Sequence, residues 1–131
     1  MELRLEVTPA MLDPEYQHLH HARILELLEK ARVAYLASKN ASMETLIAQG
    51  IFPVVTDIHV KYLREVKGGE VIASCAVKDI SERELIVDQT LINERGKIAV
   101  TANVVCKFLY RETGRAGDVP KALSSQNNNP S

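Results

Sequence analysis

Residues 13–36 decide the fold, and they read Asp13-Pro14-Glu15-Tyr16-Gln17-His18-Leu19-His20-His21 followed by Ala22-Arg23-Ile24-Leu25-Glu26-Leu27-Leu28-Glu29-Lys30-Ala31-Arg32-Val33-Ala34-Tyr35-Leu36. Asp13 is a favoured N-cap residue, proline suits the first helical position, and Glu15 adds negative charge in the first turn. Apolar residues then recur at the spacing of one helical face, at Ile24, Leu28, Ala31 and Tyr35. The stretch therefore predicts a helix that begins at Asp13 and is more than about 30 Å long.

The last turns of this predicted helix have no obvious solvent face, because residues 33–37 include no charged side chain. A helix that is apolar nearly all round is normally enclosed by other elements. We therefore expect the remaining segments to cover this helix.

Those segments read mainly as strands. Residues 2–8 alternate charged and apolar side chains, as a half-buried strand does. A short helix is predicted at residues 43–49, where Gly50 ends it. Four further strands are predicted at residues 54–63, 70–80, 84–93 and 97–110. In the first of them, Ile58, Val60 and Tyr62 share one face, and Tyr62 is expected in the core. Their short connections predict an antiparallel meander.

This order of elements predicts an α+β fold in one domain, residues 1–120. Residues 121–131 are polar, and we expect a disordered C-terminal tail there. One sheet covers only one side of a helix, so we expect at least a dimer, in which a second sheet completes the cover.

Composition excludes several classes of function. The chain has 131 residues, 16 basic and 17 acidic, with a net charge of −1 and no basic block, so it has no electrostatic signature of nucleic acid binding. No apolar run is long enough to span a membrane, and no signal peptide is expected. Cys75 and Cys106 lie in strand-like segments outside any C-x-x-C pattern. We interpret them as buried thiols of a cytoplasmic protein, with a disulfide left open.

Three segments resemble a known family. They are Val7-Thr8-Pro9-Ala10-Met11-Leu12-Asp13, His18-Leu19-His20-His21-Ala22 and Leu28-Glu29-Lys30-Ala31-Arg32. Together they resemble the pattern V-x-P-x-x-L-D-x-x-G-H-x-N-N-A followed by F-E-x-A-R of the hotdog-fold acyl-CoA thioesterases, the 4-hydroxybenzoyl-CoA thioesterase-like superfamily. Gly69-Glu70-Val71 resembles the family's G-D-x-V turn. The resemblance spans residues 3–114 and implies a hotdog fold, an antiparallel sheet wrapped around a long central helix.

The sequence departs from this pattern at the motif itself. Asp13 lies one residue further from His18 than the pattern has it, and Gln17 stands where the family has glycine. His20 and His21 replace the paired asparagines.

The resemblance implies hydrolysis of an acyl thioester linked to coenzyme A or to an acyl-carrier protein. Coenzyme A would enter only as part of the substrate, and no metal or organic cofactor, nucleic acid or membrane is implied. The assembly would be a homodimer, with its pairing into a homotetramer left open. The acyl group would lie in an apolar slot along the helix.

A thioester hydrolase needs a carboxylate and hydrogen-bond donors for the developing oxyanion. Asp13 is the candidate nucleophile or general base, although it could equally be only an N-cap. His18 and His21 could orient that carboxylate or protonate the leaving thiolate, or they could be capping or interface residues. Glu29 could be a second catalytic carboxylate, or it could only pair with Arg32 three residues on.

Other residues are candidates for substrate contact, and they are Tyr16, Gln17, His20, Leu25, His59 and Arg64. Solvated positions explain several of them as well: Tyr16 in the first turn, and His59 and Arg64 on a strand surface or edge. Asp13 and the three nearby histidines could bind a metal, but their spacing is not the His-x-x-x-His of a helical zinc site, so we predict none.

Two other functions remain open. The first is a hotdog domain that binds an acyl thioester without hydrolysing it. The second is a dehydratase or hydratase, which would carry a G-H-F-P type segment. Gln17-His18-Leu19-His20 does not match that segment.

Overall fold

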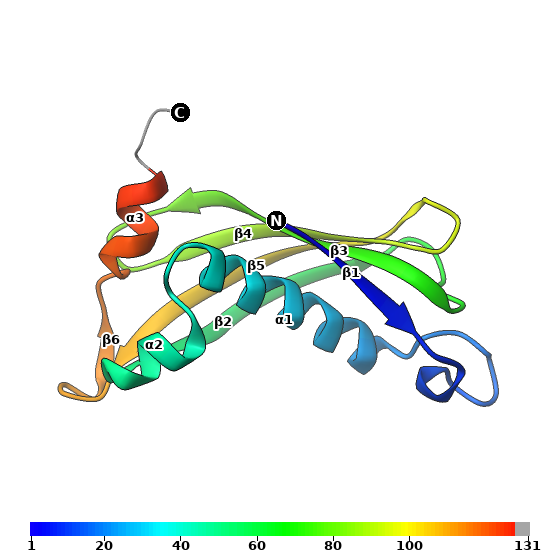
Figure 1. Cartoon of the computed structure of the whole chain (residues 1–131), viewed down its shortest axis with the longest axis horizontal. Helices are drawn as coiled ribbons and strands as arrows, with labels where there is room; N and C mark the ends of the chain where they lie inside the picture. The colour runs from blue at the N-terminus through cyan, green and yellow to red at the C-terminus, as the bar shows by residue number, and fades with distance from the viewer. Residues whose placement is uncertain (128–131) are drawn as a thin grey trace.

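A helix lies across an antiparallel sheet in the computed structural model, which describes residues 1–127 (Figure 1). Within those residues the sheet has six strands in the order β1-β3-β4-β5-β2, with β6 paired to β5. The elements are β1 (Glu2–Val7), the 3-10 turn η1 (Pro9–Met11), α1 (His21–Ser38), α2 (Met43–Ala48), β2 (Ile51–Tyr62), β3 (Gly69–Ile80), β4 (Leu85–Ile92), β5 (Ile98–Tyr110), β6 (Arg115–Gly117) and α3 (Lys121–Asn127).

The main helix, α1, begins at His21 and not at Asp13, so the predicted start is wrong by eight residues. The Asp-Pro-Glu signal forms a local turn, because Asp13 Oδ1 accepts the backbone N–H groups of Glu15 at 2.8 Å and Tyr16 at 3.3 Å. Gln17 then takes a positive φ of 56°, which a helix cannot continue through. At 18 residues α1 is about 27 Å long, shorter than predicted.

The strand order corrects the predicted meander. Strands β3, β4 and β5 are consecutive neighbours, but β2 pairs with β5 at the far edge of the sheet. The segment after β2 is therefore a crossover and not a hairpin. It is held across the end of β5, because the N–H groups of Leu63 and Arg64 both donate to the carbonyl of Ala99. Val66 in this crossover is buried.

The core lies between α1 and one face of the sheet. The apolar stripe of α1 is buried chiefly against β3, with further contacts to β1 and β4. The stripe consists of Ile24, Leu27, Leu28, Ala31, Tyr35 and Leu36, and sheet residues such as Val71, Ala73, Val87 and Val104 face it. This packing positions the helix relative to β3, but it leaves the β2 side of the helix open.

The open side is apolar on both of its walls. On α1, Leu25 and Val33 are each 37 % exposed, so a single chain covers only one side of the helix, as expected for one sheet. On β2, the register to β5 places Ile58, Val60 and Tyr62 on the face that α1 shares. Ile58 and Tyr62 are each 42 % exposed. Exposure of this many large apolar side chains along one groove is unusual for a surface that faces only water.

The C-terminal prediction is wrong over Lys121–Asn127, where helix α3 replaces the expected disorder. Val119 and Leu123 explain the difference, because both side chains are buried and give this polar segment an apolar anchor. The predicted disorder of residues 128–131 lies outside the described residues. No helix within residues 1–127 is long and apolar enough to span a bilayer.

Candidate functional site

A closed loop precedes α1 and carries the predicted catalytic aspartate. An isolated bridge joins Leu12 to Leu19, and inside it the N–H of Asp13 donates to the carbonyl of His18 at 2.8 Å. The N–H of Gln17 returns a 2.7 Å bond to the carbonyl of Asp13. These bonds hold the half-buried Asp13 beside the backbone of His18, with Oδ1 occupied by the turn.

Gln17 occupies the one position of this loop that glycine would suit. Its φ of 56° is in the left-handed region, where a side chain costs about 1–2 kcal/mol. The family pattern has glycine at this place.

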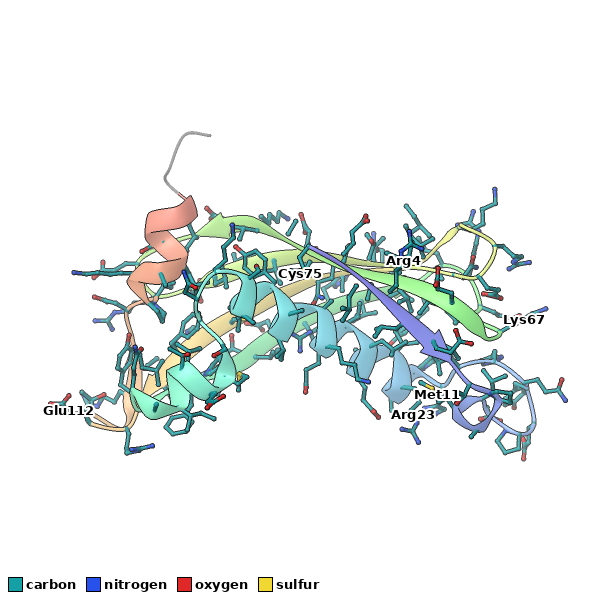
Figure 2. The ribbon with its side chains drawn as sticks, in the orientation of Figure 1. Arg4, Met11, Arg23, Lys67, Cys75 and Glu112 are labelled. Atoms are coloured by element: carbon teal, nitrogen blue, oxygen red, sulfur yellow. The ribbon has the colours of Figure 1, made fainter. Side chains whose placement is uncertain are left out.

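The N-terminus of α1 presents free backbone donors. The His20 ring caps the helix, since its Nδ1 accepts the N–H of Ala22 at 3.2 Å. Within the described residues, the N–H groups of His21 and Arg23 have no hydrogen-bond partner. Such groups, together with the helix dipole, stabilise negative charge placed before them. Figure 2 shows Met11, Arg23 and Lys67 at this same end of the molecule.

A pocket of about 220 Å³ opens at this helix terminus. His21 forms one wall and is stacked on Tyr62 of β2, with ring centroids 4.3 Å apart and an angle of 21° between the planes. His18, Arg64 and the crossover residues complete the lining. Arg64 is fixed by a 2.8 Å bond from Nη1 to the carbonyl of Ile98. The pocket lining thus includes two histidines, one arginine and one acidic residue, Glu65.

Buried Asn93 fixes the crossover that closes this pocket. Its Nδ2 donates to the carbonyl of Glu65 at 3.2 Å, and its Oδ1 accepts the N–H groups of Arg95 and Lys97 at 3.0 Å each. The amide is 3 % exposed and fully engaged, so it ties the β4–β5 turn to the pocket wall.

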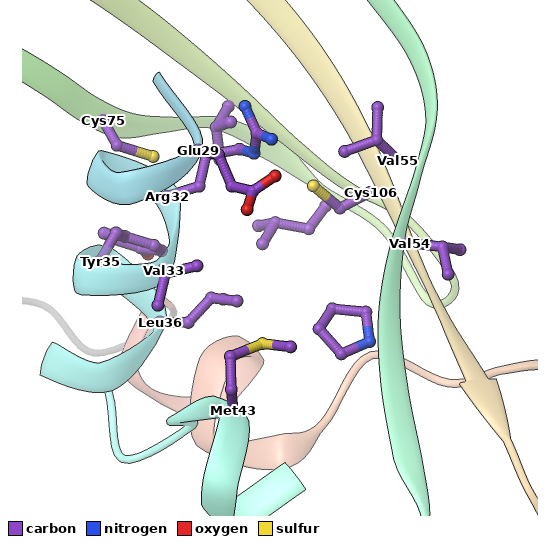
Figure 3. Close-up of a pocket in the computed structure, with 13 residues that line it drawn as sticks. Glu29, Arg32, Val33, Tyr35, Leu36, Met43, Val54, Val55, Cys75 and Cys106 are labelled. Carbon is purple, nitrogen blue, oxygen red and sulfur yellow. The ribbon is translucent and has the colours of Figure 1, made fainter. Parts of the chain in front are cut away.

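A second cavity of about 350 Å³ lies between α1 and β2, nearer the C-terminus of the helix (Figure 3). Glu29 and Arg32 are the charged residues of its lining, and most of the remaining lining is apolar. The predicted Glu29–Arg32 ion pair is absent from the described residues. Arg32 Nη1 instead donates to Oε1 of the buried Gln89 at 3.0 Å. The Glu29 carboxylate makes no hydrogen bond within the described part of the chain.

The two cysteines also line this cavity, and both are free thiols, as expected. Burial raises the pKa of Cys75 to about 12, although the Arg32 guanidinium acts in the opposite direction. Burial likewise raises the pKa of Cys106, again against Arg32. Both sulfurs are therefore protonated near neutral pH and are poor nucleophiles.

The structure brings some predicted site residues together and separates others. His18, His21 and Arg64 share the pocket at the helix terminus, where His20 is the cap. Glu29 lies in the other cavity, and Asp13 lines neither.

The remaining candidates differ in their positions. Tyr16 is 69 % exposed and is stacked on His18. Leu25 lies on the open side of α1, one turn after His21. His59 pairs with Asn103 on the face of β2 opposite to Tyr62, so a single chain does not bring it to either cavity.

Sequence reasoning missed Tyr62 and Gln89. Tyr62 was expected in the core, but it is exposed and forms a pocket wall. Gln89 is a lone amide among the apolar residues of a strand, and this was the available signal of a buried polar partner. No group of three or more His, Cys, Asp or Glu side chains among the described residues is placed to hold a metal ion.

Comparison with protein families gives one match. The family described as the thioesterase-like superfamily matches residues 7–126, which includes the loop, α1 and the whole crossover. No curated protein sequence matches the chain.

Comparison with solved structures gives many matches of the same fold. A Staphylococcus aureus protein in complex with CoA is 21 % identical, with a TM-score of 0.88 over 99 % of this chain and 85 % of that one. The DHNA-CoA thioesterase of Staphylococcus aureus is 21 % identical, with a TM-score of 0.85 over 96 % and 89 %. A thioesterase from Thermus thermophilus, complexed with coenzyme A and Zn, is 25 % identical, with a TM-score of 0.80 over 98 % and 97 %.

Proposed function

The chain belongs to the thioesterase-like superfamily and is a thioester hydrolase, as its motifs indicate, and we propose that it hydrolyses acyl-CoA thioesters with the carboxylate of Asp13. The observation that carries the catalytic assignment is the closed loop before α1, where a 2.8 Å bond from the Asp13 N–H to the His18 carbonyl holds Asp13 next to a residue that lines the pocket. The binding of CoA by proteins of the same fold supports coenzyme A over a carrier protein as the thiol.

The thioester carbonyl lies in front of the α1 N-terminus in this proposal. The N–H groups of His21 and Arg23 are the available donors, and the helix field favours the negative charge that develops on the carbonyl oxygen. Because these groups are fixed by the helix, they need little reorganisation during the reaction.

Asp13 supplies the base or the nucleophile. As a base, its carboxylate takes a proton from water while the water oxygen attacks the carbonyl carbon. The carbon–sulfur bond then breaks, and the CoA thiolate accepts a proton. His18 or His21 delivers that proton, since both imidazoles line the pocket. Asp13 Oδ2 makes no hydrogen bond within the described residues, so it is the oxygen available for this step.

The acyl group lies along the open side of α1. Successive turns of the helix place His21, Leu25 and Glu29 in one row, which leads from the pocket at the helix terminus to the larger cavity. The row faces the apolar stripe of β2, so an acyl chain between them is removed from water.

A second copy of the chain covers this groove in the proposed homodimer. Strand β2 is an edge of 12 residues with unpaired backbone groups, and Val55, Ile58 and Tyr62 are exposed on its helix side. Pairing of two β2 edges makes one continuous sheet and encloses both helices. The pairing of dimers into tetramers remains a prediction.

The pantetheine arm then enters between subunits, where Tyr16, His20 and Arg64 lie near the mouth of the pocket at the helix terminus.

Free Cys75 and Cys106 support a reducing, cytoplasmic location.

Thiol release from a panel of aliphatic and aromatic acyl-CoAs, with acyl-carrier-protein thioesters for comparison, tests the substrate assignment. We expect turnover of at least one acyl-CoA. Binding of acyl-CoA without thiol release would instead identify a domain that only binds its ligand, and turnover restricted to carrier-protein thioesters would overturn the CoA assignment.

A further inference from the structure

The lining of the larger cavity contains one arginine, Arg32, and one carboxylate, that of Glu29. Arg32 is half-buried there, and within the described residues it forms no ion pair with a carboxylate. Leu85, Val87 and Pro53 are among its apolar neighbours in the wall. A charge in such surroundings is costly unless hydrogen-bond partners satisfy it.

The only partner that the described residues supply is Gln89, and that amide is fixed in orientation. Gln89 is 1 % exposed, and its Nε2 donates to the carbonyls of Leu28 at 2.9 Å and Ser74 at 3.2 Å. Its Oε1 must therefore face Arg32, which donates through Nη1. A guanidinium has five N–H donors. Gln89 thus holds Arg32 in place and leaves donors for a ligand.

The other polar groups of the cavity define what ligand would suit those donors. The thiols of Cys75 and Cys106 are protonated and add no charge. Glu29 is the one carboxylate in the lining, and it can accept a hydrogen bond. A hydroxyl group accepts from Arg32 and donates to Glu29, whereas a carboxylate would be repelled by Glu29.

The cavity lies far from the thioester site. Arg32 follows His21 by eleven residues, which corresponds to about 16 Å along the helix axis. Only the far end of an acyl group whose carbonyl lies at the α1 N-terminus can reach Arg32, so the polar atom must be several carbons from the thioester.

We propose that Arg32, held by Gln89, is a specificity-determining residue that selects acyl groups with a hydroxyl far from the thioester. This inference rests on the proposed acyl-CoA hydrolase function and on the course of the acyl chain along α1. Glu29 accepts the hydroxyl proton in a hydrogen bond and takes no part in bond cleavage.

The test compares octanoyl- and dodecanoyl-CoA with their ω-hydroxy and ω-carboxy derivatives. Because the hydroxyl would accept a hydrogen bond from a charged donor, we expect wild type to prefer one of the two ω-hydroxyacyl-CoAs over the unsubstituted acyl-CoA of the same length. The expected ratio of the two kcat/KM values is about 10-fold or more. Arg32→Met should bring this ratio to about one while changing the kcat/KM of the plain substrate by less than about 3-fold. Arg4→Met is the matched control, because Arg4 lines neither cavity and its exposed side chain pairs with exposed Glu70.

The outcomes separate this inference from the proposed function. Thiol release without an ω-hydroxy preference in wild type, or an unchanged preference in Arg32→Met, would overturn the role of Arg32 and leave the hydrolase intact. A stronger preference for the ω-carboxy derivative would overturn the hydroxyl assignment. The ratio of kcat/KM between ω-hydroxyacyl-CoA and unsubstituted acyl-CoA is measured on wild type alone. The inference can therefore be tested even if the Arg32→Met protein misfolds. If no thiol is released at all, the hydrolase proposal fails, and dissociation constants of non-hydrolysable thioether analogues still decide the preference.

Discussion

The imidazole of His21 is stacked on the phenol ring of Tyr62, with centroids 4.3 Å apart. His21 is the first residue of α1, and Tyr62 is the last residue of β2. The stack therefore joins the helix N-terminus to the edge strand at the mouth of the smaller pocket. It also orients the imidazole nitrogens that we propose take part in proton transfer.

His21→Phe separates packing from chemistry, because a phenyl ring can keep the stack but has no nitrogen. We expect kcat to fall by about 100-fold if the imidazole moves a proton. His59→Phe should leave kcat unchanged, since His59 lies on the opposite face of β2. Steady-state kinetics on the best acyl-CoA measures both. Full activity of His21→Phe would restrict this residue to a packing role.

Gln17 carries a measurable conformational cost. Its φ of 56° favours glycine, so Gln17→Gly should raise the free energy of unfolding by about 0.5–1 kcal/mol. Gln17→Val should lower it, since a β-branched side chain tolerates this region least. Urea denaturation of the two variants checks the prediction, and equal stabilities would contradict the left-handed conformation.

The buried Cys75 thiol makes stability fall at high pH. Its folded-state pKa of about 12 lies above the ordinary thiol pKa of 9.0, so from pH 9 upward the unfolded chain loses this proton while the folded chain keeps it. Above pH 9, this thiol lowers the free energy of unfolding by about 1.4 kcal/mol per pH unit. Below pH 9, its stabilising contribution is fully present.

Chemical denaturation from pH 8 to 10 of wild type and Cys75→Ala isolates this effect from other titrating groups, with the steeper decline expected in wild type. Parallel declines would show that the thiol is accessible to water in the folded protein.

The exposed face of β2 predicts a self-associating edge. Ile58→Glu places a carboxylate on the apolar helix side of β2, where the second subunit would bury it, so it should convert the dimer to a monomer. His59→Glu adds the same charge one residue on, on the opposite face, and should leave the dimer intact. Sedimentation analysis distinguishes the two, and a wild-type monomer would refute the β2 pairing outright.

Much of the fold could be predicted from period and turn chemistry. The alternation around Ile58, Val60 and Tyr62 predicted the two faces of β2 correctly, because side chains on a strand alternate regardless of its partners. The shorter helix ending before Gly50 was also confirmed. The partner of β2 could not be predicted in this way, since the crossover after it depends on hydrogen bonds to distant Ala99.

The site was harder to predict, because local signals allow more than one outcome. Asp13-Pro14-Glu15 has the composition of a helix start, but the side-chain oxygen of Asp13 can also cap an isolated turn. The left-handed conformation of Gln17 prevents a helix from continuing, so the turn forms instead. The Glu29–Arg32 spacing suits an intrahelical pair, yet the buried Gln89, which is 57 residues from Arg32, takes the guanidinium. The sequence near Arg32 does not indicate which distant residue becomes its partner.

The most direct test of the central claim is thiol release from the best acyl-CoA by wild type, Asp13→Asn, Glu29→Gln and Glu15→Gln. Asparagine can keep the turn bonds of Asp13 Oδ1 but cannot act as the base, so we expect kcat to fall by about 100-fold or more. Glu15→Gln controls for the loss of a charge in the same loop and should be neutral. A collapse of kcat in Asp13→Asn, with unchanged fold and assembly, is the result that the proposed mechanism predicts. Full activity in Asp13→Asn, or a collapse in Glu29→Gln alone, would contradict it.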